Sequence, residues 1–435
     1  MTAKSMVIVG GIRTAIGKFG GSLREVNAEH LLAYCFRHVI KKSHIDPVII
    51  DEVIAGNICQ PVGNIARVAA LYAKVPVSVP GTTVSRNCAS GIEAISRACQ
   101  AAAAGDGEVF LVGGTENMSQ VPYIVRDARF GLKMMNHVLT DALWEGLFDP
   151  NIKQMMGRTA ENVVQKWRVS RDDQDMFAVN SHRKAVEAQK GHFFDSQILP
   201  LKIQERVVIK TGEGSCDKIV ARSQVIFGED EGPSERLVKS PVDVGNAPAV
   251  FMNDDILNPV CTKRFIDKDG TFIIERSVYD QGTVTPANSC PMNDGAAALL
   301  IMTEEAANSL RLNPLARIVS YAYVGCNPEF MGEGPMYAVP KALTKAGLGM
   351  GDIDIFELNE AFAGQAIACQ RILGIPDEKL NMWGGAIALG HPVGATGANL
   401  TIKAMHILKE TNKRYAAITM CVGGGQGGCL IIERF

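Results

Sequence analysis

Short apolar runs and helical patterns alternate along most of the chain. Strand-like runs occur at Met6–Val9 and Val109–Val112, and each one runs into a pair of glycines. The second part repeats these landmarks, with a strand-like start at Leu315–Val324 and a run at Ala416–Met420 before Cys421 and three glycines. Because the landmarks recur in the same order, the sequence predicts two duplicated halves.

Helical patterns lie between the strand-like runs, at Ile92–Ala104 and at Asn399–Lys409. Strands that alternate with helices are typical of layered architecture, in which helices cover the faces of a sheet. The predicted fold class is therefore α/β, built from duplicated layered α/β halves.

The region between the halves differs from them in its pattern of charged and turn-forming residues, and it is predicted to be an inserted loop domain that binds substrate. It carries charged stretches at Arg168–Asp175 and Gly228–Arg236 among many turn signals. A structureless connection of this length is implausible, so we expect helices and strands within it, including a helix at Asp172–Gln189. The predicted divisions are an N-terminal half, the insertion, a return to the N-terminal half and a C-terminal half, at residues 1–117, 118–290, 291–314 and 315–435.

Composition limits the classes of function. The 435 residues exceed what one hydrophobic core usually serves, and 47% hydrophobic with 21% charged residues match a soluble globular protein. A net charge of -2 provides no broad field for nucleic acid, so we expect no nucleic-acid partner. The start of the chain has no cleavage signature, and no apolar run is long enough to span a membrane. We therefore expect an unprocessed protein without a membrane span.

Eleven cysteines are scattered along the chain without a CxxC pair or regular spacing. This pattern favours free thiols in a reducing compartment over a disulfide framework or a zinc site. The sequence therefore predicts a cytoplasmic protein without a metal site.

One cysteine stands where a β-type run gives way to a helical pattern, in the segment VSRNCASG at Val84–Gly91. Cys88 would lie at a helix start, where unpaired backbone N–H groups and the helix dipole favour the nucleophilic thiolate. We expect Cys88 to be a reactive thiol with a depressed pKa. A buried structural cysteine is the commoner fate of a single cysteine, so this motif alone leaves both interpretations open.

A second candidate is the one histidine in the glycine-rich segment GGAIALGHPVGATG at Gly384–Gly397. Glycines let backbone and ligand approach closely, and Pro392 fixes the chain directly after His391, so the segment cannot be a regular helix throughout. It contains neither a dinucleotide-binding fingerprint nor a P-loop. An active-site loop and an ordinary histidine remain equally open at this point.

Two shorter segments complete the set. The segment CVGGGQGG at Cys421–Gly428 follows an apolar strand, and its turn could expose backbone N–H groups for an oxyanion hole or merely join two strands. The segment NEAFA begins at Asn359 after the apolar stretch Ile353–Leu358, so Asn359 could be functional or could cap a helix.

Together these segments closely resemble the thiolase family, and the resemblance covers nearly the whole chain. It runs from IRTAIGKFGG near the start, through MGRTAENV at Met156–Val163 and NDGAAALL at Asn293–Leu300, to the final glycine cluster. The resemblance implies a thiolase-like fold and an acyltransferase. Such an enzyme cleaves 3-ketoacyl-CoA with CoA into acetyl-CoA and a shortened acyl-CoA, or runs the reverse Claisen condensation, through an acyl-cysteine.

The same resemblance assigns roles to residues. Cys88 corresponds to the acylated nucleophile, His391 to the residue that activates it, and Cys421 to the general acid/base. Asn359 corresponds to the holder of a water in one oxyanion site, and the backbone N–H groups of Cys88 and Gly423 to the second site. CoA and acyl-CoA enter as substrates, and no tightly bound cofactor is implied. The family also implies a homodimer or homotetramer, and it admits a β-oxidation partner subunit.

Departures from the family pattern concern the substrate contacts. Cys290 stands where many members carry a serine near the pantetheine. Met155-Met156-Gly157 replaces the HMG of the short-chain acetoacetyl-CoA type, and the middle region is long for that type. The missing HMG and the long middle region favour the degradative type, whereas CVGGGQG resembles the short-chain enzymes, so acyl-chain length and physiological direction stay open. The predicted contacts to substrate and CoA are Met155, Met156, Ser289, Cys290 and Phe362.

Two other interpretations are weighed against this one. A ketoacyl synthase of the same superfamily pairs its cysteine with two histidines, whereas the corresponding places here hold Asn359, His391 and Cys421. A non-catalytic lipid or CoA carrier on the same fold would not need all four catalytic segments, which are intact here.

Overall fold

The apolar runs of both halves form strands of one large mixed sheet. In this computed structural model the described residues are 4–126, 128–134, 136–209, 218–252, 262–266, 272–276 and 282–435. The strands of the large sheet are β1 (Met6–Arg13), β2 (Gly17–Lys18), β3 (Glu52–Gly56), β4 (Gly81–Val84), β5 (Val109–Asn117), β14 (Asn293–Thr303), β15 (Ala316–Gly325), β16 (Ile355–Leu358), β17 (Tyr415–Val422) and β18 (Gln426–Arg434). Their order is β16-β17-β18-β15-β1-β14-β5-β3-β4, with β2 paired to β14.

The two halves repeat one pairing scheme. In the first half, β1 is antiparallel to β14, β14 is antiparallel to β5, and β5 is parallel to β3. In the second half, β15 is antiparallel to β18, β18 is antiparallel to β17, and β17 is parallel to β16. The halves join where β1 pairs with β15, with Met6 opposite Ile318. The repeated scheme confirms the predicted duplicated α/β fold.

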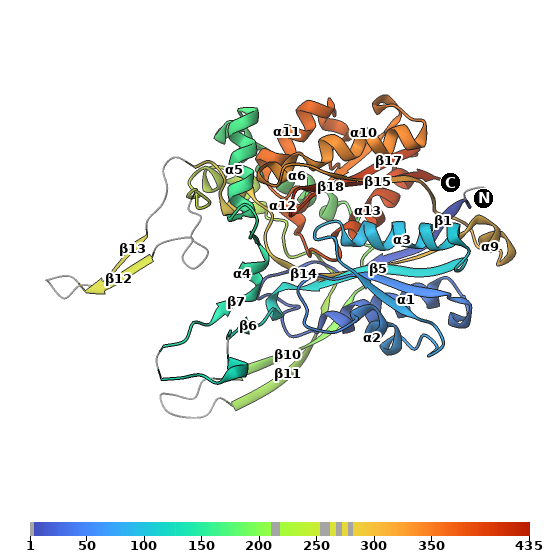
Figure 1. Ribbon diagram of the computed structural model, residues 1–435, viewed down its shortest axis with the longest axis horizontal. Helices are drawn as coiled ribbons and strands as arrows, with labels where there is room; N and C mark the ends of the chain where they lie inside the picture. Colours follow the sequence, from blue (N-terminus) through green and yellow to red (C-terminus); the bar gives the residue numbers. More distant parts are fainter. Residues whose placement is uncertain are drawn as a thin grey trace.

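Helices form a central layer between the halves and cover their outer faces (Figure 1). Helices α3 (Ser90–Ala104) and α13 (Thr396–Glu410) pack against each other, and each contacts strands of both halves. Helix α13 is buried along most of its length, as a helix enclosed on all sides must be. Helices α1 (Ala28–Lys42) and α2 (Ile65–Tyr72) cover the first half, and α10 (Gly334–Ala346) covers the second.

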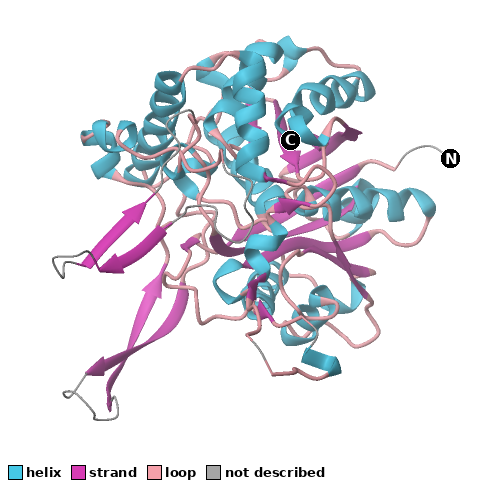
Figure 2. Ribbon diagram, turned by 60° about the vertical axis from the view of Figure 1, so that its left-hand side comes forward, coloured by secondary structure: helices cyan, strands magenta, loops and turns pink. Residues whose placement is uncertain are grey.

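Between β5 and β14 the chain forms a series of short elements, two longer helices and two hairpins. The elements there are η2 (Met118–Gln120), β6 (Tyr123–Ile124), η3 (Ala128–Phe130), β7 (Thr140–Asp141), α4 (Ala142–Gly146), β8 (Phe148–Asp149), β9 (Gln154–Met155), α5 (Met156–Trp167), α6 (Arg171–Lys190), β10 (Leu201–Ile209), β11 (Lys218–Phe227), α7 (Glu235–Lys239), α8 (Val242–Gly245), β12 (Thr262–Ile266), β13 (Phe272–Arg276) and η4 (Pro286–Asn288). Helix α6 contains the predicted helical stretch. The strand pairs β10–β11 and β12–β13 project from the layered body (Figure 2).

Some of the predicted insertion lies outside the described residues, and the remaining elements of the chain belong to the two halves. These elements are η1 (Pro47–Ile49), α9 (Glu304–Ser309), η5 (Pro328–Glu333), η6 (Met350–Asp352), α11 (Ala363–Leu373), η7 (Asp377–Lys379) and α12 (Ala386–Leu389). Among the helices of the described ranges, none is long and apolar enough to cross a membrane.

The glycine pairs that follow two of the apolar runs lie inside strands. Strand β1 continues through Gly10 and Gly11, and β5 continues through Gly113 and Gly114. A Cβ atom at Gly114 would collide with the carbonyl oxygen of Gly394, which belongs to the loop after His391. The strands therefore extend beyond the apolar runs, and at Gly114 the missing side chain lets the histidine loop approach β5.

Candidate active site

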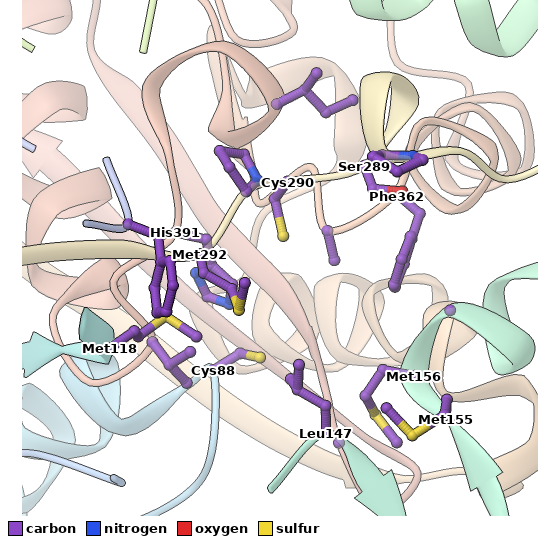
Figure 3. Close-up of a pocket in the computed structure, with 18 of the residues that line it drawn as sticks. Cys88, Met118, Leu147, Met155, Met156, Ser289, Cys290, Met292, Phe362 and His391 are labelled. Carbon is purple, nitrogen blue, oxygen red and sulfur yellow. The ribbon is translucent and has the colours of Figure 1, made fainter. Parts of the chain in front are cut away.

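A cavity of about 1040 Å³ opens where both halves meet the region between β5 and β14 (Figure 3). Its wall is mainly apolar and includes Met118, Leu143, Leu147, Phe148, Phe251, Met292 and Met331. The predicted site residues that line it are Cys88, His391, Cys421, Gly423, Met155, Met156, Ser289, Cys290 and Phe362. The fold therefore brings together segments that are far apart in the sequence. Asn359 is not among the lining residues and is fully buried.

Cys88 lies in the turn between β4 and α3, partly accessible from the cavity. Burial among the apolar walls raises the pKa of the Cys88 thiol to about 11. Hydrogen bonds from the backbone of Gly423 and of Cys88 itself lower this pKa, and the charge of Glu116 raises it. The predicted depressed pKa is therefore wrong for the free protein, because desolvation outweighs the backbone N–H groups. The resting group is the thiol.

His391 is buried, and its ring is held in one orientation by Thr396. The Nδ1 atom lies 2.6 Å from Oγ1 of Thr396, and that hydroxyl donates its proton to the carbonyl oxygen of Pro392 at 2.9 Å. Since the hydroxyl has one proton, it must accept from Nδ1–H, which leaves Nε2 with its lone pair free. Burial lowers the pKa of His391 to about 4, so the ring is neutral near pH 7.

The Nε2 atom of His391 is buried and has no hydrogen-bond partner in the described part of the chain. It is therefore an available proton acceptor on a residue that shares the cavity wall with Cys88. The loop itself is fixed by Asn293, whose Oδ1 accepts from the backbone N–H of His391 at 3.0 Å. As predicted, the segment is not a regular helix throughout, because α12 ends at Leu389 and α13 begins at Thr396.

Cys421 lies near the end of β17 and is fully buried. Burial raises the pKa of its thiol well above the ordinary value, and the nearby Cys88 adds to the shift. Cys421 is therefore a neutral thiol, which suits a proton donor. The following turn joins β17 to β18 through Gly424 and Gly425, whose φ values of 86° and 76° favour glycine. The turn is thus a tight strand connection that also directs the backbone of Gly423 at Cys88.

Asn359 lies between β16 and α11, and it does not cap that helix, whose N-cap residue is Phe362. The helix-cap interpretation is therefore wrong. Both amide atoms of Asn359 are buried, and neither has a hydrogen-bond partner among the described residues. An unpaired buried amide is costly, by about 1–3 kcal/mol, so this side chain is suited to hold a water molecule.

The predicted substrate contacts differ in what they can offer a ligand. The hydroxyl of Ser289 donates to the carbonyl oxygen of Thr285 at 2.7 Å, so its proton is already used. Burial raises the pKa of the Cys290 thiol, which leaves a neutral group on the wall. The ring of Phe362 packs edge-on against Phe251, with centroids 6.2 Å apart. With the methionines at 155 and 156, these side chains form an apolar surface.

The sequence did not single out Glu116, a buried carboxylate on β5. It accepts hydrogen bonds from the backbone N–H groups of Gly394 at 2.9 Å and Cys59 at 2.9 Å. It therefore ties the histidine loop to the wall beside Cys88. Burial raises the pKa of Glu116 to about 7. An acidic residue shortly after the apolar run and the two glycines of β5 is the signal that could have found it.

The sequence predicts free thiols and no metal site. In the part of the chain that the structure describes, no three His, Cys, Asp or Glu side chains are grouped so that they could hold a metal ion. The nine cysteines in that part are all free thiols.

The duplicated halves and a cavity that brings Cys88, Cys421 and the neutral His391 together fit an enzyme that carries an acyl group on a thiol. Family comparison agrees with this class. The model described as thiolase, N-terminal domain matches residues 6–225 and 275–305, and the model described as thiolase, C-terminal domain matches residues 312–434. The chain belongs to the thiolase family.

Individual relatives match over almost their whole length. Proteins of Staphylococcus epidermidis and Staphylococcus aureus, each named "Probable acetyl-CoA acyltransferase", are 38% identical over 433 residues, covering 99% of both chains. The structure of the Bacillus anthracis acetyl-CoA acetyltransferase is 35% identical with a TM-score of 0.86, covering 100% of this chain and 99% of that one. Human mitochondrial 3-ketoacyl-CoA thiolase is 34% identical with a TM-score of 0.85, covering 100% of both chains.

Proposed function

We propose that this protein is a thiolase that cleaves 3-ketoacyl-CoA with CoA, and catalyses the reverse Claisen condensation, through an acyl group carried on Cys88. The observation that carries the proposal is the meeting in one cavity of Cys88, His391 with its free Nε2 atom, and the buried thiol of Cys421. The names of the relatives from both bacteria and humans support the same activity.

In the first half-reaction, the sulfur of Cys88 attacks the ketone carbon of the substrate. Because the pKa of Cys88 is about 11 and that of His391 is about 4, a resting thiolate–imidazolium pair is disfavoured. The proton therefore moves to Nε2 of His391 as the C–S bond forms. The C–C bond then breaks, its electron pair stays on the acetyl-CoA enolate, and the thiol of Cys421 supplies the proton.

In the second half-reaction, a CoA thiol attacks the acyl thioester on Cys88. Its proton passes to the thiolate of Cys421, and the Cys88 thiolate recovers its proton from His391. Negative charge develops on an oxygen in each half-reaction. The backbone N–H groups of Cys88 and Gly423 would stabilise one oxyanion, and His391 with a water on Asn359 would stabilise the other. The backbone hydrogen bond from Gly423 to Cys88 and the unpaired amide of Asn359 support these assignments.

CoA is proposed as a substrate and not as a tightly bound cofactor. A structural neighbour, human mitochondrial 3-ketoacyl-CoA thiolase in complex with CoA, is 33% identical with a TM-score of 0.86. Residues of the proposed 118–290 insertion form much of the cavity wall, including Met155, Met156 and Phe251, which supports its role in binding substrate and CoA.

A homodimer or homotetramer in the cytoplasm is part of the same proposal, with a β-oxidation partner subunit as a further possibility. Large apolar side chains that are exposed in the single chain support self-association, among them Phe130 at 87% and Met134 at 95% exposure. The free thiols support a reducing compartment.

The proposal is tested by a CoA-dependent cleavage assay on a series of 3-ketoacyl-CoA substrates of increasing chain length, followed in both directions. We expect acetyl-CoA and a shortened acyl-CoA to form in equal amounts, and the series to show the preferred length. A protein that binds acyl-CoA but cleaves none of the series would instead be a lipid or CoA carrier on this fold.

The hydrogen bond from His391 to Thr396 leads to a further prediction. Thr396→Val removes the acceptor for Nδ1–H, so the tautomer with Nε2 protonated competes and kcat falls by roughly tenfold, about the value of one hydrogen bond. Thr396→Ser keeps the hydroxyl and should retain most of the activity. Steady-state kinetics of both variants across pH provide the measurement. Equal losses in the two variants would show that packing, and not the hydroxyl, is what matters.

A further inference from the structure

We infer that Asn87 is a positioning residue that holds the backbone of Gly423 in place beside the nucleophile. The inference rests on the proposed function, in which the N–H of Gly423 stabilises an oxyanion of the substrate. The backbone of Gly423 also hydrogen-bonds Cys88 and lowers the pKa of its thiol. Asn87 would not touch the reacting atoms but would act through the glycine turn.

The side chain of Asn87 bonds directly to this turn. Its Nδ2 atom donates to the carbonyl oxygen of Gly423 at 2.9 Å, although the two residues are 336 positions apart in the sequence. A Cβ atom on Gly423 would lie 3.3 Å from the same Nδ2 atom, so the amide also contacts the α-carbon side of the glycine. Asn87 thus links the turn that carries Cys88 to the turn that follows Cys421.

The backbone of Asn87 makes this link rigid. Its φ of 43° lies in the left-handed region, which asparagine tolerates better than most residues with a side chain. Its carbonyl oxygen accepts from the backbone N–H of Ser90 at 3.0 Å and from Oγ of Ser90 at 2.7 Å. The amide of Asn87 is therefore presented to Gly423 from a fixed base at the start of α3.

The glycine turn needs such an anchor because it has no side chains of its own. Residues 423–425 are all glycine, and glycine backbones rotate more freely than others. The far end of the turn is held by the N–H of Cys326, which donates to the carbonyl oxygen of Gly425 at 2.7 Å. At the near end, the bond from Asn87 restrains the carbonyl of Gly423. This restraint limits the rotations that would turn the N–H of Gly423 away from Cys88.

Three variants separate the amide from the backbone conformation. Asn87→Gly removes the amide but accepts the positive φ, whereas Asn87→Ala removes the amide and adds left-handed strain. Asn412→Gly is the matched control. Asn412 also has a positive φ, of 53°, and a side chain that accepts one hydrogen bond, from Arg434 at 2.8 Å. It lies on the surface and does not line the cavity.

Each variant is assayed in two ways. The first is the rate of iodoacetamide labelling at Cys88 across pH, read by mass spectrometry, and the second is kcat and KM for 3-ketoacyl-CoA cleavage. We expect Asn87→Gly to slow labelling at a fixed pH and to lower kcat, each by about three- to tenfold, with a smaller change in KM. Asn87→Ala should show the same losses and a lower Tm. Asn412→Gly should match the wild type in both assays.

The inference is overturned if Asn87→Gly has the same labelling rate and the same kcat as Asn412→Gly. It is also overturned if the labelling rate and kcat fall only in Asn87→Ala, since backbone conformation alone would then explain the effect. Labelling needs no thiolase turnover. A wild-type protein without cleavage activity would therefore refute the proposed function, while the labelling rates would still test Asn87.

Discussion

Cys88→Ala is expected to abolish covalent acylation and to lower C–C cleavage by about 10⁶-fold, to the background rate. No other group can take over, because the reaction needs a nucleophile next to the free Nε2 atom of His391. The thiols of Cys421 and Cys290 share the cavity wall, but burial raises the pKa of Cys290 further than that of Cys88 and raises the pKa of Cys421 well above its ordinary value. Intact-mass measurement after incubation with acetyl-CoA, together with the cleavage assay, gives both results.

Cys99→Ala is the matched control for this experiment. Cys99 lies on α3, the helix that follows Cys88, but it does not line the cavity. The control should be acylated like the wild type. An acetyl group that accumulates on Cys421 in the Cys88→Ala protein would reverse the proposed roles of the two cysteines.

Cys421→Ala is expected to keep acylation while losing turnover. Cys88, His391 and the Gly423 turn remain, so the acyl group of a simple acyl-CoA should still transfer to Cys88. Cleavage and condensation should fall by roughly 10²–10⁴-fold, because no positioned group protonates or deprotonates the acetyl-CoA carbon. Mass spectrometry of the acyl-enzyme and steady-state rates in both directions measure the two effects separately.

Cys429→Ala controls for the loss of a buried thiol. Cys429 lies on β18, is as fully buried as Cys421, and does not line the cavity. This variant should lose stability, as buried truncations do, while keeping turnover per folded molecule. Full C–C turnover by Cys421→Ala would exclude it as the acid/base.

The sequence by itself determined the repeated order of strands and helices. Apolar runs at Val109–Val112 and Ala416–Met420 became β5 and β17, and the helical pattern at Ile92–Ala104 became α3. These elements follow from local periodicity, which neighbouring residues carry without help from the rest of the chain. The segments around Cys88, Asn359, His391 and Cys421 together indicated the thiolase family, since each segment is continuous in the sequence.

The tertiary structure decided the properties that depend on what packs around each group. The pKa of Cys88 is raised instead of depressed because apolar walls from distant segments desolvate it. Asn359 was open to interpretation as a helix cap, but the helix begins later, and among the residues that the structure describes the buried amide has no hydrogen-bond partner. Gly114 follows an apolar run in the sequence, but only the fold shows that it makes room for the loop of His391. Burial and close approach are set by residues far away in the chain, so no local pattern could reveal them.

The sequence contains the residues that form the hydrogen bonds of the site, but only the tertiary structure shows which of them are bonded to each other. Thr396 lies five residues after His391, yet only the three-dimensional path of the loop shows that its hydroxyl fixes the tautomer of the ring. The contact from Asn87 to Gly423 spans the two duplicated halves. The sequence therefore determined which chemical groups are present and the order of the elements that carry them. Folding decided their protonation and their partners, because both depend on solvent exclusion and on contacts between segments distant in the chain.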